Sequence, residues 1–130
     1  MDDQKRRDAG MTQRRKVLGN AWVDKASASQ TPFNAEFQDF ITRYAWGDIW
    51  ARPGLPRHTR SLVTLALMAA LNRGDEFKMH VRAAFNNGVT RDEINEVLMH
   101  TALYAGLPAA NAAYHLAAEV FADMDRTAKP

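Results

Sequence analysis

The amino-acid sequence predicts an all-α fold, and three observations favour this class. No segment alternates apolar and polar residues with the period of a β-strand over a useful length. Apolar residues instead recur at helical spacing, as in Phe37, Phe40, Ile41 and Tyr44, in stretches that glycine and proline separate. Thr90-Arg91-Asp92-Glu93 has the pattern of a capping box, which begins a helix. Together these signals predict about six helices.

The first half of the chain is predicted to hold two helices. A polar helix covers residues 2–18 and ends near Gly19, because glycine is favoured just after a helix. A connector that contains serines, a threonine and a proline follows over residues 19–33. Asn34 is placed to cap the second helix, whose apolar spacing continues towards Trp50.

The third predicted helix starts near Pro56 or Arg57, after a turn that two prolines and a glycine force at residues 52–56. Its sequence is apolar almost all round, so it needs cover on several sides. In a chain of this size, we expect another copy of the protein to supply part of that cover.

Three further helices are expected in the second half. The fourth covers about residues 75–87 and stops at Gly88, and the fifth begins at the capping box of Thr90. Gly106 and Pro108 mark the end of the fifth helix and the start of the sixth, which runs to about Met124.

Composition narrows the class of protein. The length of 130 residues suits one domain, predicted at residues 1–130 with a polar helical leader at 1–23. The absence of cysteine excludes disulfides, thiolate nucleophiles and cysteine-based zinc sites. A net charge of +2 with interleaved acidic residues gives little support to nucleic-acid binding. The longest nearly apolar run, residues 62–71, is too short to cross a bilayer, so we expect a soluble cytoplasmic protein with no membrane partner.

The most informative segment places Arg73, Glu76 and His80 on one stripe of the fourth predicted helix. A guanidinium, a carboxylate and an imidazole on a common face can bind an anion and move a proton without a metal. The competing interpretation is an ordinary surface pair of Glu76 and His80, with the histidine satisfied locally. The other histidines match no metal-ligand spacing, so no metal site is predicted.

Two further groups are candidate binding residues. Trp46 and Trp50 precede Arg52 at a helix exit, where the arginine is placed to point into a cleft, although tryptophans four residues apart are also typical of a core. Positive side chains that include Arg57 and Arg60 crowd the start of the third helix, where the helix dipole disfavours cations and a bound anion would compensate them. A solvent-facing Arg60 is the alternative interpretation.

Several motifs resemble the carboxymuconolactone decarboxylase family over about residues 24–121. They are Arg60-Ser61-Leu62, the segment from Glu76 to His80, Gly88-Val89-Thr90, Glu93-Ile94 and Tyr104-Ala105-Gly106-Leu107-Pro108. In the related alkylhydroperoxidase D branch, a Cys-x-x-Cys pair precedes the histidine, whereas this chain has Arg73 and Glu76 at those positions. Thiol peroxidase chemistry is therefore excluded, because it needs two sulfurs.

The resemblance implies an alkylhydroperoxidase D-like helical fold assembled as a homo-oligomer, a trimer or a hexamer. It also implies cofactor-free decarboxylation of 4-carboxymuconolactone, a dicarboxylate lactone, to β-ketoadipate enol-lactone in protocatechuate catabolism. For this reaction, we hypothesise that His80, oriented by Glu76, donates the proton. The residues expected to bind substrate are Arg60, Arg52, Arg73, Trp46 and Trp50. The alternatives are a non-enzymatic oligomeric scaffold or binding module, and a related lactone decarboxylase or isomerase that acts on another dicarboxylate.

Overall fold

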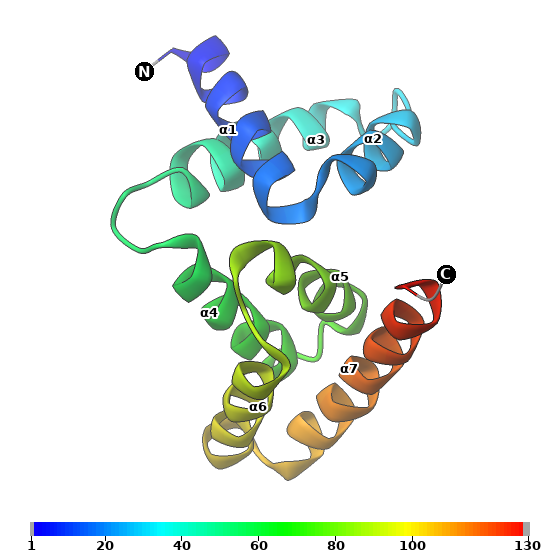
Figure 1. Cartoon of the computed structure of the whole chain (residues 1–130). Coiled ribbons are helices and arrows are strands. Elements are labelled where there is room, and N and C mark those ends of the chain that lie inside the picture. The colour runs from blue at the N-terminus through cyan, green and yellow to red at the C-terminus, as the bar shows by residue number, and fades with distance from the viewer. Residues whose placement is uncertain (1, 129–130) are drawn as a thin grey trace. The chain divides into compact units, whose positions relative to one another are not determined.

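The computed structural model describes residues 2–128 and confirms the all-α class, since it contains no strand within that range. The helices are α1 (Asp3–Leu18), α2 (Asn20–Ala28), α3 (Ala35–Ile41), the π-helix η1 (Thr42–Trp50), α4 (Arg57–Ala70), α5 (Gly74–Ala84), the 3₁₀-helix η2 (Phe85–Asn87), α6 (Arg91–Ala105) and α7 (Leu107–Ala128). Figure 1 shows this order along the chain.

The chain divides into two compact units. The N-terminal unit, Met1–Arg57, contains α1 to α3 and η1, and the C-terminal unit, His58–Pro130, contains almost all of α4 and then α5 to α7. This division does not test the single domain expected from the sequence, which stays a prediction.

The prediction of about six helices was wrong by one, because residues 20–28 form α2 where the sequence favoured a connector. Gly19, with φ of 90°, separates α1 from α2 in a left-handed conformation that glycine tolerates. The serines that indicated a loop lie at the end of α2, and Ser29 Oγ donates to the backbone oxygen of Lys25. Val23 is fully buried, which anchors this short helix.

The polar first helix packs against η1 within its own unit. Gly10 and Gly47 allow this approach, because a Cβ added at Gly10 would lie 1.9 Å from the backbone oxygen of Thr42. Two ion pairs flank the contact: Arg6 Nε lies 3.2 Å from Asp48 Oδ1, and Arg7 binds Asp39. The predicted leader is therefore an integral part of the N-terminal unit.

The second predicted helix has the expected extent but changes type along its length. Asn34 lies just before α3, yet its side chain accepts a hydrogen bond from the backbone nitrogen of Thr31 and does not cap the helix. After Ile41 the turns widen into η1, and the nitrogen of Ala51 donates to the oxygen of Trp46, five residues earlier. Such π-turns are rare and often occur at functional sites.

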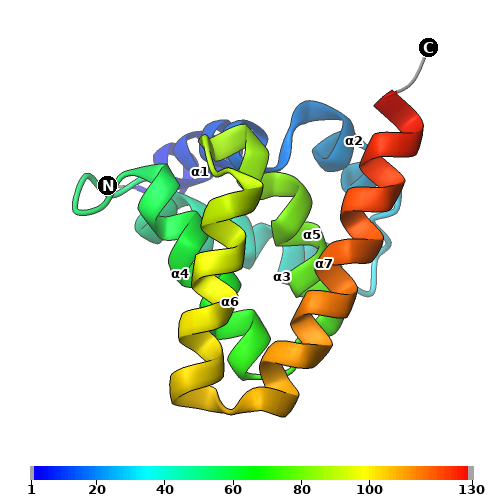
Figure 2. The same ribbon diagram turned by 60° about the horizontal axis from the view of Figure 1, so that its bottom comes forward.

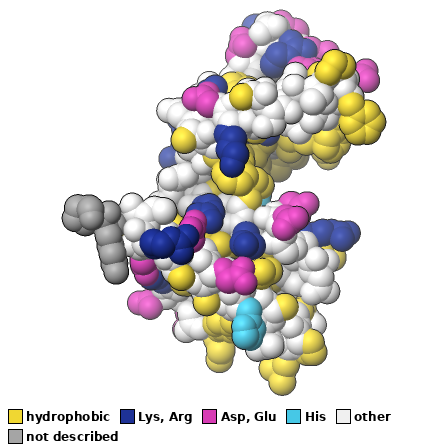
Figure 3. Space-filling view, turned by 90° about the vertical axis from the view of Figure 1, so that its right-hand side faces the viewer, with side chains coloured by type: hydrophobic (Ala, Val, Ile, Leu, Met, Phe, Trp, Pro, Cys, Tyr) yellow, Lys and Arg dark blue, Asp and Glu magenta, His cyan; other side chains and the backbone are white. Residues whose placement is uncertain are grey.

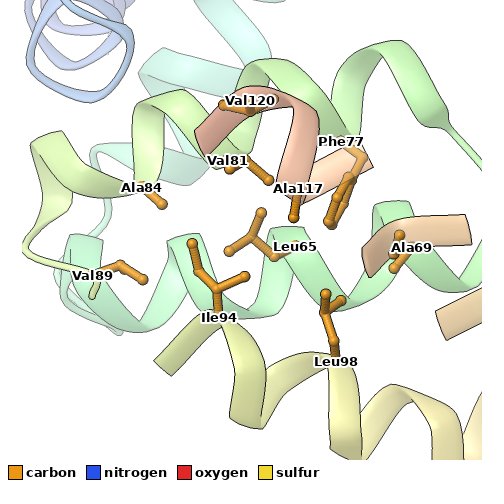
Figure 4. Close-up of a cluster of buried hydrophobic side chains, with 11 residues drawn as sticks. Leu65, Ala69, Phe77, Val81, Ala84, Val89, Ile94, Leu98, Ala117 and Val120 are labelled. Carbon is orange, nitrogen blue, oxygen red and sulfur yellow. The ribbon is translucent and has the colours of Figure 1, made fainter. Parts of the chain in front are cut away.

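The C-terminal unit has a single apolar core, to which α4, α5, α6 and α7 all contribute (Figure 4). Leu65, Phe77, Ile94 and Leu98 are its largest fully buried side chains. The last two helices, α6 and α7, form an antiparallel hairpin (Figure 2), and they meet at Gly106 with φ of 101°. Within residues 2–128, no helix combines the length and the apolar character that a membrane span requires.

The predicted helix signals in this unit are confirmed. Thr90 caps α6 through a complete capping box: its side chain accepts from the nitrogen of Glu93, and Glu93 Oε1 accepts from the nitrogen of Thr90. Gly88 ends the preceding helical segment with φ of 80°, as the αL position there requires. The fourth and fifth predicted helices therefore correspond to α5 with η2 and to α6.

Candidate active site

The predicted reactive stripe lies on α5, at different depths along the helix. His80 is buried with 8% of its surface exposed, whereas Glu76 and Arg73 are exposed. Arg73 occupies the position before the first turn of α5, and Glu76 lies in that turn, where its negative charge interacts favourably with the helix dipole. The stripe thus runs from the surface into the C-terminal unit.

Burial controls the protonation of His80. Desolvation lowers the pKa of its imidazole to about 4, and the negative charge of Glu76 opposes this shift without cancelling it. Glu76 by itself would raise the pKa of His80, but burial has the larger effect. The imidazole is therefore neutral at pH 7 in the free protein.

A cavity of about 180 Å³ lies beside Arg73, between the end of α4, the start of α5 and α7. Its walls are mainly apolar and include Ala69, Phe77 and Leu116, so Arg73 provides the cationic side chain of this lining. His80 and Glu76 do not line it. The cavity therefore supports a binding role for Arg73 and gives no direct support to the catalytic pair.

The start of α4 carries the predicted cations Arg57 and Arg60, both half-buried. His58, between them, has a partner in the same unit: its Nε2 lies 2.8 Å from Glu93 Oε2. Hydrogen bonding to His58 lowers the pKa of Glu93 below its usual value. Part of the charge compensation that the sequence assigned to a bound anion thus comes from Glu93, the same residue that completes the capping box of α6.

The remaining predicted residues belong to the N-terminal unit. Trp46 is buried and Trp50 half-buried on η1, and their rings contact each other at a centroid distance of 5.2 Å. Arg52 is exposed just after the helix. Asp48, between the two tryptophans, pairs with Arg6 of α1. The π-helix therefore holds the two tryptophans as one packed pair.

Sequence reasoning missed a buried polar contact between α4 and η2. Ser61 is fully buried, and Asn87, 7% exposed, donates from Nδ2 to the oxygen of Ala83 at 3.1 Å and to Ser61 Oγ at 3.5 Å. Within residues 2–128, Asn87 Oδ1 accepts no hydrogen bond. Ser61 shares the buried face of α4 with Leu65, which was the available signal. No group of three His, Asp or Glu side chains among the described residues could hold a metal ion.

Comparison of the sequence with known proteins identifies its family. The family model described as the carboxymuconolactone decarboxylase family matches residues 35–119, which include every predicted site residue. The chain belongs to the carboxymuconolactone decarboxylase family. The match begins at α3 and ends within α7, so both units contribute to the family pattern.

Three similar proteins are named as decarboxylases. The chain is 56% identical to the 4-carboxymuconolactone decarboxylase of Acinetobacter baylyi over 124 residues, which cover 95% of this chain and 92% of that protein. It is 46% identical to the nitrosuccinic acid decarboxylase of Metarhizium robertsii over 78% of this chain and 71% of that protein. A 48-residue stretch, 37% of this chain, is 54% identical to the whole of a 4-carboxymuconolactone decarboxylase sequence from Pseudomonas putida.

Proposed function

We propose that this protein is a carboxy-lyase that converts 4-carboxymuconolactone to β-ketoadipate enol-lactone and CO₂ without a cofactor, in the protocatechuate branch of the β-ketoadipate pathway. The observation that carries the proposal is the 56% identity to a 4-carboxymuconolactone decarboxylase over nearly the full length of both chains. The second decarboxylase of that name, from Pseudomonas putida, supports the same activity.

The substrate explains how the reaction proceeds with protein groups alone. Its departing carboxylate is attached to a ring carbon next to a carbon–carbon double bond, and this double bond is conjugated with the lactone carbonyl. When the carbon–carbon bond breaks, CO₂ leaves and the electron pair moves through the ring to the carbonyl oxygen, which gives a dienolate. A proton then adds to the carbon next to the carbonyl. The protein has to bind two carboxylates, stabilise the dienolate and supply that proton.

In this proposal, His80 donates the proton and Glu76 influences the imidazole from one turn earlier on α5. Because the pKa of His80 is about 4 in the free protein, the imidazole needs a nearby negative charge before it holds a proton at pH 7. The two carboxylates of the substrate provide such charge. Binding of the substrate therefore raises the pKa of His80, so that the imidazole carries the proton that it donates.

The cations have the complementary task of binding the substrate. Arg60 and Arg52 bind the carboxylates and Arg73 assists, since a guanidinium matches a carboxylate with two parallel hydrogen bonds. Trp46 and Trp50 exclude water from the departing carboxylate, and its loss of hydration favours cleavage. The buried, ring-to-ring packing of the tryptophans suits this role.

A second candidate function is decarboxylation of another dicarboxylic acid. It is favoured by the 46% identity to a nitrosuccinic acid decarboxylase. In nitrosuccinate, the nitro group is attached to a carbon that also carries a carboxylate. It can accept the electron pair released by loss of CO₂, as the lactone carbonyl does, so the same protein groups suit both reactions. Comparison of CO₂ release from 4-carboxymuconolactone and from nitrosuccinate would separate the two candidates.

We also propose that the protein is a homo-oligomer, a trimer or a hexamer, located in the cytoplasm. The proposal of assembly is supported by apolar side chains at the surface of the single chain. Val63 and Leu67, 46% and 51% exposed, lie on the side of α4 opposite its buried face, and Leu71, 56% exposed, follows directly after the helix. A second copy would cover this stripe.

The test of the function is turnover of purified protein, followed as CO₂ release from 4-carboxymuconolactone. His80→Ala should reduce turnover by at least roughly a hundredfold, since general-acid catalysis contributes that much or more. The matched control is His115→Ala, because His115 is an exposed histidine on α7 and should leave turnover unchanged. Both variants should keep the helical circular dichroism and oligomeric size of the parent.

Two outcomes would contradict the proposal. Near-normal turnover in His80→Ala would remove this imidazole from the reaction while leaving the enzyme class intact. No CO₂ release by the parent protein from either acid would favour the non-enzymatic scaffold.

A further inference from the structure

The N-terminal unit contains a polar cavity of about 150 Å³ between α1, α2, α3 and η1. Its polar lining residues are Arg7, Arg14, Ser27, Gln30, Gln38 and Asp39, together with Thr42. None of them is a residue of the candidate active site. The volume is several times the share of one water molecule in the liquid, about 30 Å³, so the cavity has room for a small ligand.

Arg14 is the unusual side chain of this lining. Its guanidinium is half-buried, and burial lowers its pKa from the usual value. Nη1 donates to Thr42 Oγ1 at 3.3 Å and Nη2 donates to Gln38 Oε1 at 3.1 Å, and both acceptors are uncharged. Among the ion pairs of the described residues, none involves Arg14. A partly desolvated cation with neutral acceptors is stabilised further by an anion.

Asp39, the acidic residue of the same lining, is already paired with two arginines. Asp39 accepts from Arg7 through both of its oxygens, at 2.5 and 3.2 Å, and from Arg43 at 2.8 Å. These two guanidinium groups lower the pKa of Asp39 to about 2, so it is a fixed negative charge that they neutralise. The excess positive charge of the cavity therefore belongs to Arg14.

The N-terminal unit as a whole also has a positive net charge, which favours an anionic ligand. Residues 1–57 contain ten Lys and Arg residues against seven Asp and Glu residues. Each Nη atom of Arg14 carries two N–H groups and uses one of them in the hydrogen bonds above. Two N–H groups of the Arg14 Nη atoms thus make no hydrogen bond among the described residues, and the lining also contains the hydroxyl of Ser27 on α2 and the amide of Gln30 just after that helix.

We propose that this cavity binds the carboxylate of a small organic acid, with Arg14 as the main contact and Ser27 and Gln30 as additional donors. A carboxylate is favoured over a phosphate for two reasons. The planar guanidinium fork matches a planar carboxylate. A single carboxylate charge also balances the one excess positive charge of the lining, that of Arg14, whereas a phosphate dianion would leave one negative charge uncompensated.

The test uses the full-length protein labelled with ¹⁵N, titrated with sodium acetate and sodium succinate against sodium chloride at equal ionic strength. Saturable shifts of resonances from residues 26–42 are expected with both acids and not with chloride. Arg14→Gln should weaken binding at least roughly tenfold, since it removes a charged hydrogen-bond donor. Lys16→Gln, the same charge change at an exposed position of α1, should keep the affinity of the parent within about twofold.

A second variant keeps the test valid if Arg14→Gln unfolds. Ala26→Leu fills the cavity from α2 and leaves the cation in place, so it should also abolish the saturable shifts. Circular dichroism and thermal melting of each variant report whether the fold is kept.

Three results would overturn the proposal: no saturable shift in the parent protein, equal affinity in the parent and in folded Arg14→Gln, or unchanged binding in folded Ala26→Leu. Shifts that depend on protein concentration and not on added acid would also overturn it, because they would assign the cavity to a carboxylate of a second copy.

Discussion

At the scale of single residues, depth below the surface separates side chains that the sequence groups together. Arg73, Glu76 and His80 share one stripe of α5, yet His80 is buried and the other two are exposed. The free-energy cost of charging a buried imidazole exceeds the attraction of one partly solvated carboxylate, so the pKa of His80 falls to about 4. In the reaction that we propose, His80 therefore depends on the negative charge of the substrate to hold its proton.

The same shift predicts how the stability of the protein varies with pH. Between pH 6.5 and about 4, the unfolded chain protonates this histidine and the folded chain does not, so the free energy of unfolding falls as pH falls. His80→Gln should remove about 2 kcal/mol of the loss between pH 7 and pH 5. Urea denaturation of parent and variant at both pH values, at one protein concentration, measures this difference. An equal loss in both proteins would show that the pKa of His80 is not lowered in the folded state.

At the scale of helices, small residues set how closely α1 approaches η1. Gly10 and Gly47 leave no space for a methyl group, because a Cβ at Gly47 would lie 2.5 Å from the backbone oxygen of Arg6. Backbone atoms cannot move aside as a flexible side chain can. The ion pair of Arg6 with Asp48 across this contact depends on the same separation.

Gly10→Ala should therefore destabilise the protein by at least about 2 kcal/mol, as overpacking of a close contact does. Gly74→Ala is the matched control, since its Cβ would meet a flexible atom, Leu116 Cδ1, at an ordinary 3.4 Å. This control should be neutral or stabilising by up to about 1 kcal/mol, because alanine favours the helix. Denaturant melts of both variants provide the measurement, and similar stability of the two would refute the close contact.

At the scale of the whole molecule, apolar surface exceeds what a single chain covers. Besides the exposed side of α4, three apolar side chains lie around the turn between α6 and α7: Leu103 and Tyr104 at the end of α6 and Leu107 at the start of α7, each more than 70% exposed. Figure 3 shows hydrophobic side chains in yellow at the lowest end of the C-terminal unit, where Figure 1 places this turn. Contiguous apolar surface of this kind typically marks a protein interface.

Leu67→Glu places a charge in the middle of the exposed stripe of α4, so we expect it to shift the protein to smaller species in analytical ultracentrifugation. The control is Ala122→Glu, the same charge at an exposed position of α7. Loss of assembly in the first variant and its retention in the second would agree with an interface at α4. Unchanged sedimentation of Leu67→Glu, or a monomeric parent, would contradict it.

The local signals of the sequence were sufficient for most of the fold. Capping by Thr90 and Glu93, the αL glycine at Gly88 and the spacing of apolar residues depend on neighbours within a few positions, so the helix ends of α5 and α6 were predictable. The missed helix α2 is only nine residues long and has one fully buried residue, Val23. A helix this short is marginal by itself, so contacts with the rest of its unit decide whether it forms.

The sequence by itself determined the helical class, the stripe of Arg73, Glu76 and His80, and the motifs of the family, because periodicity and residue type are local properties. The tertiary structure decided the burial of His80, the ion pair of His58 with Glu93, and the packing of α1 on η1 through Gly10. These features join residues that are distant in sequence, or they depend on the exclusion of water from a side chain. The spacing of residues along one helix predicts neither of them.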